Sequence, residues 1–372
     1  MGSAPLEGIK VVELARILAG PWAGQVLADL GAEVIKVESP QGDDTRSWGP
    51  PFIENPDGSQ DAAYFHATNR GKQSITIDFA TTEGQHLVRE LVAEADVLIE
   101  NFKVGGLSKY GLDYDNLAQA NPRLIYCSIT GFGQDGPYAK RAGYDYIIQA
   151  MGGIMHLTGE PDGQPQKIGV AYADILTGLY SVIAIQAALA ERERSGLGQH
   201  IDMALLDVMV GTLANQAMNY LVTGTSPTRM GNRHPNITPY EAVPTRDSWI
   251  ILAVGNDSQY KRFCDVVGIA PRPEFSSNAK RLKAREELTP IVHEATAKWS
   301  RADLLAALEQ AGVPAGPINS ITDVFADPQI VHRGMKLALD RSDGLKVPGV
   351  RNPIRFSRST LASGKASPKL GD

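Results

Sequence analysis

The N-terminal part of the chain alternates short apolar runs with segments of helical spacing. Residues 9–14 predict a strand, residues 20–30 a helix of small residues, and residues 33–38 a second strand. Together they predict a βαβ unit of about 30 residues. The alternation continues with predicted strands at 74–79, 96–100 and 123–129 and a predicted helix at 82–95. Because strands alternate with helices, we expect an α/β fold with a mostly parallel sheet covered by helices.

Further along, the pattern predicts a long apolar helix over 174–194 and, after residues 201–203, a further helix to about 222. Residues 223–239 are rich in turn formers, which indicates a domain boundary. Residues 40–62 are too polar and too broken for either period and predict a long surface loop. The predicted partition is a large domain over 1–222 with a linker helix at 204–222, a small domain over 223–325 and a return segment over 326–372.

Composition narrows the class of protein. The 372 residues carry a net charge of -6, with 43% hydrophobic and 21% charged residues, as in ordinary folded proteins of about two domains. Because the net charge is negative, the chain as a whole lacks the excess of positive charge that would attract nucleic acid. Only Cys127 and Cys264 occur, without a CxxC pair, which favours a reducing cytoplasm. The N-terminus resembles no leader, and no stretch approaches the roughly 18 apolar residues of a membrane span, so we expect a cytoplasmic protein.

Several motifs suggest chemistry but lack its usual context. Residues 131–136 (Gly-Phe-Gly-Gln-Asp-Gly) match GxGxxG after a predicted strand, yet Pro137 follows where a dinucleotide-binding helix would begin, so a loop is favoured. Glu38 ends the second strand, where either a ribose ligand or solvent would meet it. The seven histidines are scattered, so we expect no metal site. Cys127 lies in an apolar run, which favours a buried, inert thiol.

Asp174 stands at the opening of the long apolar helix. Its carboxylate has two interpretations. It is an N-cap that satisfies free backbone N–H groups of the first turn, or it is a nucleophile or base held at a helix start and facing a cleft. The local sequence leaves both open.

An ordered set of short motifs extends over nearly the whole chain. They lie at residues 5–14, 19–21, 30–38, 42–46, 69–72, 96–102, 141–145, 173–178 and 312–317. In this order they resemble the class III CoA-transferase family, which includes carnitine and formyl-CoA transferases and the α-methylacyl-CoA racemases. Residues 44–52, 126–131 and 324–329 resemble the succinyl-CoA:glutarate branch in particular.

The resemblance implies that Asp174 is the nucleophile of a CoA-transferase. The expected reaction moves CoA from an acyl-CoA donor, succinyl-CoA or another dicarboxylyl-CoA, to a small carboxylic acid, through an aspartyl anhydride and an aspartyl-CoA thioester. CoA is then a substrate, and no tightly bound cofactor is expected. The alternative is an acyl-CoA racemase acting by α-proton transfer. Tyr144 stands where racemases of the family have a histidine, and a phenol is a poor base at neutral pH, which disfavours that alternative.

The resemblance also implies binding residues. The expected CoA contacts are Ile17, Leu18, Ile77, Asp78, Phe79, Asn101, Phe102, Lys103, Lys109, Lys140 and Arg141. The four basic ones would be local cations for the phosphates of an otherwise acidic protein, or else solubilising surface charges. The expected substrate contacts are Arg16, Arg46, Trp48, Tyr144 and Arg233, with one of the three arginines pairing with a distal carboxylate.

The family fold implies a Rossmann-like large domain built from both ends of the chain and a smaller α+β domain. It also implies an interlocked homodimer, in which the aperiodic C-terminal tail packs on the large domain or on the partner.

Overall fold

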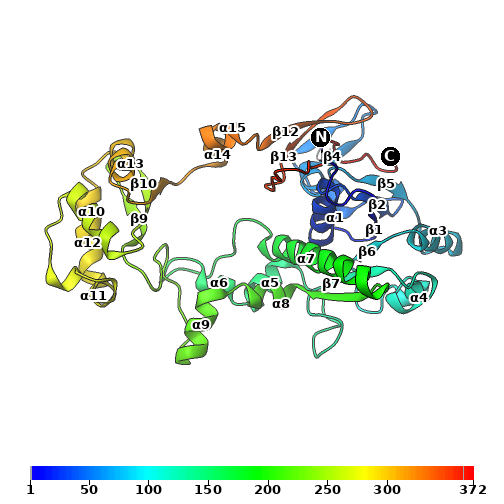
Figure 1. Ribbon diagram of the computed structural model, residues 1–372, viewed down its shortest axis with the longest axis horizontal. Coiled ribbons are helices and arrows are strands. Elements are labelled where there is room, and N and C mark those ends of the chain that lie inside the picture. The colour runs from blue at the N-terminus through cyan, green and yellow to red at the C-terminus, as the bar shows by residue number, and fades with distance from the viewer. Residues whose placement is uncertain (1, 363) are drawn as a thin grey trace. The chain divides into compact units, whose positions relative to one another are not determined.

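The computed structural model describes residues 2–362 and 364–372. The chain forms two compact units (Figure 1). The first contains the chain up to Ile154, Lys167–Thr225 and Pro328–Asp372, and the second contains Met155–Gln166 and Ser226–Asp327. The structure differs from the predicted partition at residues 155–166, which belong to the second unit although the sequence pattern assigned them to the large domain.

The first unit is built on a parallel sheet of six strands in the order β5-β2-β1-β6-β7-β8. The strands are β1 (Lys10–Glu13), β2 (Glu33–Glu38), β5 (Gln73–Thr76), β6 (Val97–Glu100), β7 (Ile125–Thr130) and β8 (His200–Ala204). Val12 of the central strand pairs in register with Ile35 of β2 and Leu98 of β6. The predicted α/β class and parallel central sheet are therefore confirmed.

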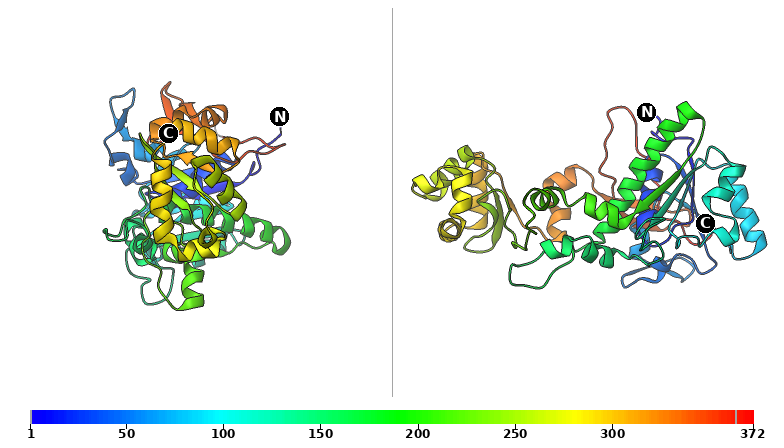
Figure 2. Two further views of the ribbon diagram at one scale, coloured as in Figure 1. Left: turned by 90° about the vertical axis from the view of Figure 1, so that its left-hand side faces the viewer. Right: turned by 90° about the horizontal axis from the view of Figure 1, so that it is seen from below.

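Alternate strand residues point to opposite faces of the sheet, and each face has its own helices (Figures 1 and 2). One face is covered by α1 (Ala19–Asp29), α5 (Asp145–Met151), α7 (Tyr172–Ser195) and α8 (Leu205–Gly211), and the other by α3 (Thr82–Ala93) and α4 (Tyr114–Ala120). Ile99 and Cys127 lie in the first core, whereas their neighbours Leu98 and Tyr126 lie in the second.

Helix α7 is long and apolar enough to cross a membrane by length and composition, as no other helix of the described residues is. Its residues Ala173, Val182, Ile185 and Ala188 are buried in the core that α7 shares with α1 and the sheet. That is the environment of a core helix in a globular unit.

The predicted linker helix over 204–222 is wrong as a single element. Ala204 ends β8, α8 stops at Gly211, and α9 (Ala214–Thr223) begins after Thr212 and Leu213, with a φ of +47° at its first residue. The loop predicted over 40–62 also holds short elements, namely the 3₁₀ turn η1 (Asp44–Ser47) and the antiparallel hairpin of β3 (Phe52–Glu54) and β4 (Gln60–Ala62). Helix α2 (Ala63–His66) follows directly, and η2 (Ser108–Tyr110) lies after β6.

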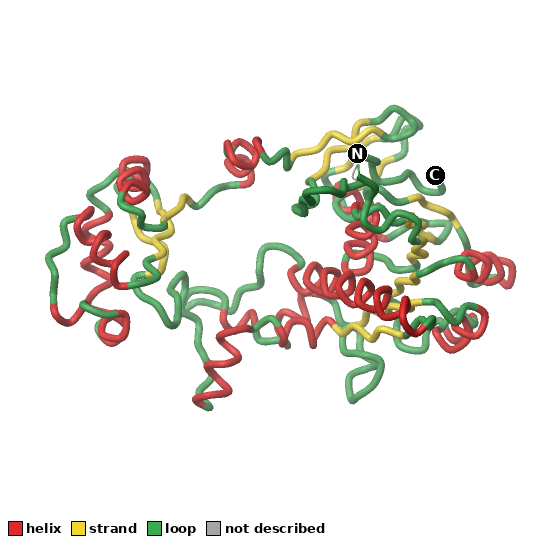
Figure 3. Tube along the Cα trace, viewed as in Figure 1, coloured by secondary structure: helices red, strands yellow, loops and turns green. Residues whose placement is uncertain are grey.

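The second unit packs helices on a small antiparallel sheet in the order β11-β10-β9 (Figure 3). Its strands are β9 (Tyr240–Pro244), β10 (Trp249–Ala253) and β11 (Ala315–Pro317). Its helices are α10 (Asp257–Val267), η3 (Pro273–Phe275), α11 (Asn278–Lys283), α12 (Arg285–Thr296), α13 (Arg301–Gln310) and α14 (Ile321–Ala326), and α6 (Ile154–Leu157) lies where the chain first enters this unit. Phe263, Val292 and Leu304 are fully buried in its core.

The chain then returns to the first unit through α15 (Pro328–His332) and the hairpin of β12 (Lys336–Asp340) and β13 (Lys346–Val350). The last residues lie on the sheet edge. The backbone N–H of Ser74 on β5 donates to the carbonyl of Asp372 at 2.9 Å, and Ser367 is buried with its hydroxyl 2.5 Å from His66 Nδ1. The aperiodic tail thus packs on the large unit.

Candidate active site

Asp174 lies in the first turn of α7, but it does not cap the helix. The cap residue is Ala171, and the N-cap interpretation of Asp174 is wrong. The capping group comes from α5, where the Asp145 carboxylate accepts the backbone N–H of Ala173 at 2.8 Å and that of Asp174 at 3.3 Å. Gln149 donates its amide to the other Asp145 oxygen at 2.7 Å, which fixes the orientation of this carboxylate.

The Asp174 carboxylate is half-buried and has no hydrogen-bond or ion-pair partner among the described residues. Burial, and then the negative charge of Asp145, raise the pKa of Asp174 to about 7. The charge of Asp174 also acts on Tyr64 of α2. Burial, and then this charge, raise the pKa of Tyr64 to about 12. A poorly solvated carboxylate without a partner is a reactive group, and such perturbed groups gather at functional sites.

Gly178 is the point at which α7 packs against the start of α1. It lies one helical turn after Asp174, and a Cβ at Gly178 would meet the carbonyl oxygen of Ala19 at 2.7 Å and the Trp22 Cβ at 3.1 Å. Only glycine lets α7 pack this closely on the start of α1. The glycine four residues after Asp174 in the sequence motif is therefore needed for the direct contact between α7 and α1.

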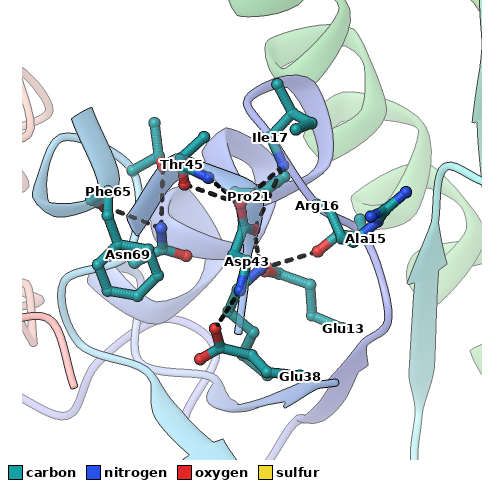
Figure 4. A network of polar contacts seen from close by, with 12 residues as sticks. Glu13, Ala15, Arg16, Ile17, Pro21, Glu38, Asp43, Thr45, Phe65 and Asn69 are labelled. Atoms are coloured by element: carbon teal, nitrogen blue, oxygen red, sulfur yellow. Dashed lines mark hydrogen bonds and ion pairs between the residues drawn. The ribbon is translucent and has the colours of Figure 1, made fainter. Parts of the chain in front are cut away.

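The first βα turn is held by side chains from three other segments, and Figure 4 shows one of them, Asp43, beside Ile17. Lys36 donates to the carbonyl of Ala15 at 2.8 Å, and Asp43 accepts the N–H of Ile17 at 3.3 Å. Asn101 accepts the N–H of Arg16 at 2.9 Å and donates to its carbonyl at 2.7 Å. Ile17 has a φ of +72°, an outlier for a β-branched residue.

Some of the predicted CoA contacts lie together beside this turn. Phe79, Phe102 and Tyr110 form an aromatic cluster in which Phe79 meets the other two rings edge to face at 5.7 and 5.6 Å. The Arg16 guanidinium lies over Phe102 at 5.6 Å and the Lys109 ammonium over Tyr110 at 4.5 Å. Aromatic rings beside an ammonium group such as that of Lys109 are suited to a nucleotide with phosphates.

The other predicted CoA contacts are placed differently. Leu18 and Ile77 are buried. Asp78 and Lys103 are exposed at the surface. Lys140 and Arg141 lie in the loop after β7, where Arg141 stacks on Tyr138 at 3.9 Å and no contact of the described residues joins it to the aromatic cluster.

The predicted substrate contacts divide in the same way. Trp48 is 45% exposed and meets the Tyr64 ring edge to face at 5.4 Å, and Tyr144 is 64% exposed beside Asp145. Arg16 is half-exposed and paired with Asp44 at 2.9 Å. Arg233 belongs to the second unit, where its guanidinium pairs with Glu241 and Glu286.

The assignment of Arg46 to substrate binding needs correction. Arg46 is 7% exposed, its Nη2 donates to Glu38 at 2.7 Å and its Nη1 to Asp61 at 3.0 Å. Its guanidinium also lies 3.6 Å from the centre of the Phe65 ring. A cation whose donors are already paired and buried is not free to bind a distal carboxylate. The ion pair with Arg46 also buries Glu38, which is therefore neither a ribose ligand nor a solvated strand end.

The remaining motifs have structural roles. Residues 131–136 form a loop without a following helix, in which the Gln134 N–H donates to Asp202 at 2.9 Å. Burial raises the pKa of the Cys127 thiol to about 12, as expected for an inert cysteine. Within 2–362 and 364–372, no group of three potential metal ligands occurs. Sequence reasoning missed Tyr64, and it noted Asp43 and Asp145 only within the motifs at 42–46 and 141–145, without assigning them roles.

A profile of CoA-transferase family III matches residues 6–372, which includes every residue of the site described above. The chain belongs to this family. The succinate–glutarate CoA-transferase of Agrobacterium fabrum is 61% identical over 99% of this chain and 93% of that protein. The human succinyl-CoA:glutarate CoA-transferase is 40% identical over 99% of this chain and 84% of that protein.

A crystal structure gives the same fold. That of a CAIB/BAIF family protein from Brucella suis covers 100% of this chain and 97% of its own, with 63% identity and a TM-score of 0.90. The chain is thus a family III CoA-transferase, an enzyme whose substrates are CoA thioesters.

Proposed function

We propose that this family III CoA-transferase moves CoA from succinyl-CoA, or another dicarboxylyl-CoA, to a free carboxylic acid, with Asp174 as the nucleophile. The carrying observation is the Asp174 carboxylate, which is half-buried and unpartnered among the described residues. It lies on a helix that packs through Gly178 against the start of α1, directly after the turn that would bind CoA. The names of the two relatives reported above support succinate and glutarate as the first acids to test. They do not favour the racemase alternative.

The proposed reaction uses acyl transfers between activated carbonyls. The Asp174 carboxylate attacks the thioester carbonyl, which gives a mixed anhydride and CoA thiolate. The thiolate then attacks the aspartyl carbonyl, so that the donor acid leaves as a carboxylate and Asp174 becomes a CoA thioester. The acceptor carboxylate repeats both steps in reverse and regenerates Asp174. Each step develops an oxyanion, which backbone N–H groups near Asp174 would stabilise.

Acylation also changes the electrostatics of the site. Asp174 carries a negative charge next to that of Asp145 before it reacts, and burial adds to the cost of that charge. The anhydride and the thioester are neutral at this position. Formation of either intermediate therefore relieves both the repulsion and the poor solvation.

Arg16 is the proposed partner of the distal carboxylate of the donor. Its backbone is clamped by Asn101, its side chain is half-exposed, and its pairing with Asp44 is a surface ion pair that a ligand carboxylate can replace at small cost. Arg46 is excluded by its burial.

We also propose that the enzyme is a homodimer. Within the first unit, α7 exposes Leu179, Tyr180 and Ile183, and α5 exposes Tyr146 and Ile147, by 39 to 61% each. Large apolar side chains exposed on two helices that pack together favour a protein partner, and a second copy of this chain is the partner that the family implies.

The test is an intact-mass spectrum of the protein incubated with succinyl-CoA, with and without hydroxylamine. We expect a CoA adduct that hydroxylamine removes, that maps to Asp174, and that is absent from Asp174→Ala. An absent adduct with a panel of acyl-CoAs, together with deuterium uptake at the α-carbon, would move the assignment to the racemase branch. Retained CoA binding without any turnover in the parent would make the protein a binding member only.

The same assay addresses Arg16. Arg16→Met should slow adduct formation from succinyl-CoA more than from butyryl-CoA, because only the former carries a distal carboxylate. Equal slowing with both thioesters would assign Arg16 to CoA alone.

A further inference from the structure

Ile17 adopts a conformation that its own side chain disfavours. Its φ is +72°, in the left-handed region, where the branched Cβ crowds the following carbonyl. Glycine is the usual residue in such a position. A strained residue of this kind persists only where its surroundings fix it, so the source of the constraint can be sought among its contacts.

The constraint on the Ile17 peptide is Asp43. Its two carboxylate oxygens lie 3.4 and 3.3 Å from the Ile17 nitrogen and accept its N–H (Figure 4). Lys36 and Asn101 hold the carbonyl of Ala15 and both backbone groups of Arg16, so the backbone entering the strained residue is fully engaged.

Asp43 is itself immobile. It is 2% exposed, and Lys36 Nζ lies 2.9 Å from its Oδ2. Its Oδ1 accepts the Thr45 N–H at 3.0 Å and the Thr45 hydroxyl at 2.8 Å, while its own N–H donates to Glu38 at 2.8 Å. A buried carboxylate held by Lys36 and Thr45, on a backbone held by Glu38, has little freedom to follow Ile17 if that peptide relaxes. The geometry therefore forces the turn to follow the carboxylate.

We propose that Asp43 is a positioning residue for acyl-CoA binding, because its fixed carboxylate holds Ile17 in the left-handed conformation that the CoA-binding turn requires. The inference rests on the proposed function, in which the first βα turn, with Ile17 in it, binds CoA. Asp43 itself touches neither substrate nor Asp174 in this scheme. It acts by keeping the turn ordered before CoA binds, so that binding does not bear the entropic cost of ordering it.

The test compares Asp43→Asn with Asp61→Asn. Both variants remove one negative charge from the same buried ionic cluster, but Asp61 pairs with Arg46 and has no contact with Ile17. Asp43→Asn should raise the KM for succinyl-CoA about tenfold with a much smaller change in kcat. Asp61→Asn should lower thermal stability to a comparable extent and leave that KM unchanged.

A rescue experiment separates strain from a general structural role. Ile17→Gly removes the side-chain cost of a positive φ. Adding Asp43→Asn to Ile17→Gly should therefore raise KM only about twofold over Ile17→Gly alone. An equal effect of Asp43→Asn in both backgrounds, or an equal rise of KM in Asp61→Asn, would overturn the inference.

If Asp43→Asn does not fold, Thr45→Val gives a milder test. It deletes the hydroxyl that holds Asp43 Oδ1 and keeps the side-chain shape. The KM for succinyl-CoA should rise about threefold, and an unchanged KM in a folded variant would contradict the proposal. Loss of the Asp174 adduct in the parent enzyme would instead contradict the proposed function, so the two failures are distinct.

Discussion

The two carboxylates at the start of α7 have different environments and therefore different roles. Asp145 accepts two backbone N–H groups and the Gln149 amide, which stabilise its charge. Asp174 has no such donors among the described residues, and its pKa is raised to about 7 by burial and by Asp145. Environment thus separates a structural carboxylate from a reactive one, as in other sites with paired acids.

The pH dependence of adduct formation follows from this arrangement. Asp174 attacks only when ionised, so in the parent enzyme the rate should fall as the pH drops through about 7. Asp145→Asn keeps an oxygen for the two N–H groups but removes the charge that raises the pKa of Asp174. The acidic limb should therefore move to lower pH, while burial keeps it above the ordinary range of an aspartate. The measurement is the rate of hydroxylamine-sensitive adduct formation across pH.

A second variant controls for the hydrogen bond to Gln149. In Asp145→Asn the new amide nitrogen faces the amide nitrogen of Gln149, and two donors then meet. Adding Gln149→Glu gives the amide introduced at position 145 an acceptor. It also puts a negative charge at residue 149, which is further from α7 than the original charge of Asp145. The acidic limb of this double variant should lie between those of the parent and the single variant. If all three limbs coincide, the charge of Asp145 does not set the pKa of Asp174.

At the level of single residues, resemblance identified Asp174 because its motif is local in sequence. Asp145 and Asp43 act on residues 29 and 26 positions away, so no local spacing shows their partners. Arg46 was assigned to substrate for a related reason. An arginine in a polar segment suggests an exposed cation, whereas the ion pairs with Glu38 and Asp61 that bury it form only in the fold.

Among the elements, the contact between α1 and α7 is the one on which the site depends most directly. Gly178→Ala would place a methyl group 2.7 Å from the Ala19 carbonyl, a backbone atom that cannot move aside alone. We expect a loss of about 1–3 kcal/mol in the free energy of unfolding and a slower adduct at Asp174, because the start of α7 must shift. Denaturant unfolding and the adduct assay measure the two effects.

Gly211→Ala is the matched control for this substitution. Gly211 also lies in a helix, but a Cβ there meets nothing within 4 Å. Alanine should be neutral or slightly stabilising at this position, since glycine is the poorer helix former. A comparable loss in both variants would mean that the close approach at Gly178 is not what limits the packing of α7.

Regular elements were the most predictable part of the fold. The helix predicted over 174–194 is α7 at Tyr172–Ser195, because a long apolar segment has few other solutions. The helix predicted to about 222 failed, since hydrophobic spacing does not reveal the break between Gly211 and Ala214. The hairpin of β3 and β4 was missed because its strands have three residues each, too few to establish a period.

For the whole molecule, the apolar surface on α5 and α7 is the feature that the chain by itself does not account for. Ile183 is 61% exposed on a helix whose opposite face is fully buried, and Tyr146 is 60% exposed on α5. Exposing such a surface to water is unfavourable, by roughly 25 cal/mol for each Å² of apolar area. Its presence next to the residues that hold Asp174 links the proposed dimer to the stability of the site.

Ile183→Glu tests this link. A charge on this apolar surface should convert the proposed dimer to monomers in light scattering after gel filtration, and it should slow adduct formation at Asp174 because α7 loses its cover. Leu87→Glu is the control, since Leu87 is 43% exposed on α3, which covers the other face of the sheet. That variant should keep both the mass of the parent and its adduct rate. A parent enzyme that is monomeric at micromolar concentration would refute the dimer, and an Ile183→Glu monomer with an unchanged adduct rate would show that Asp174 reacts without it.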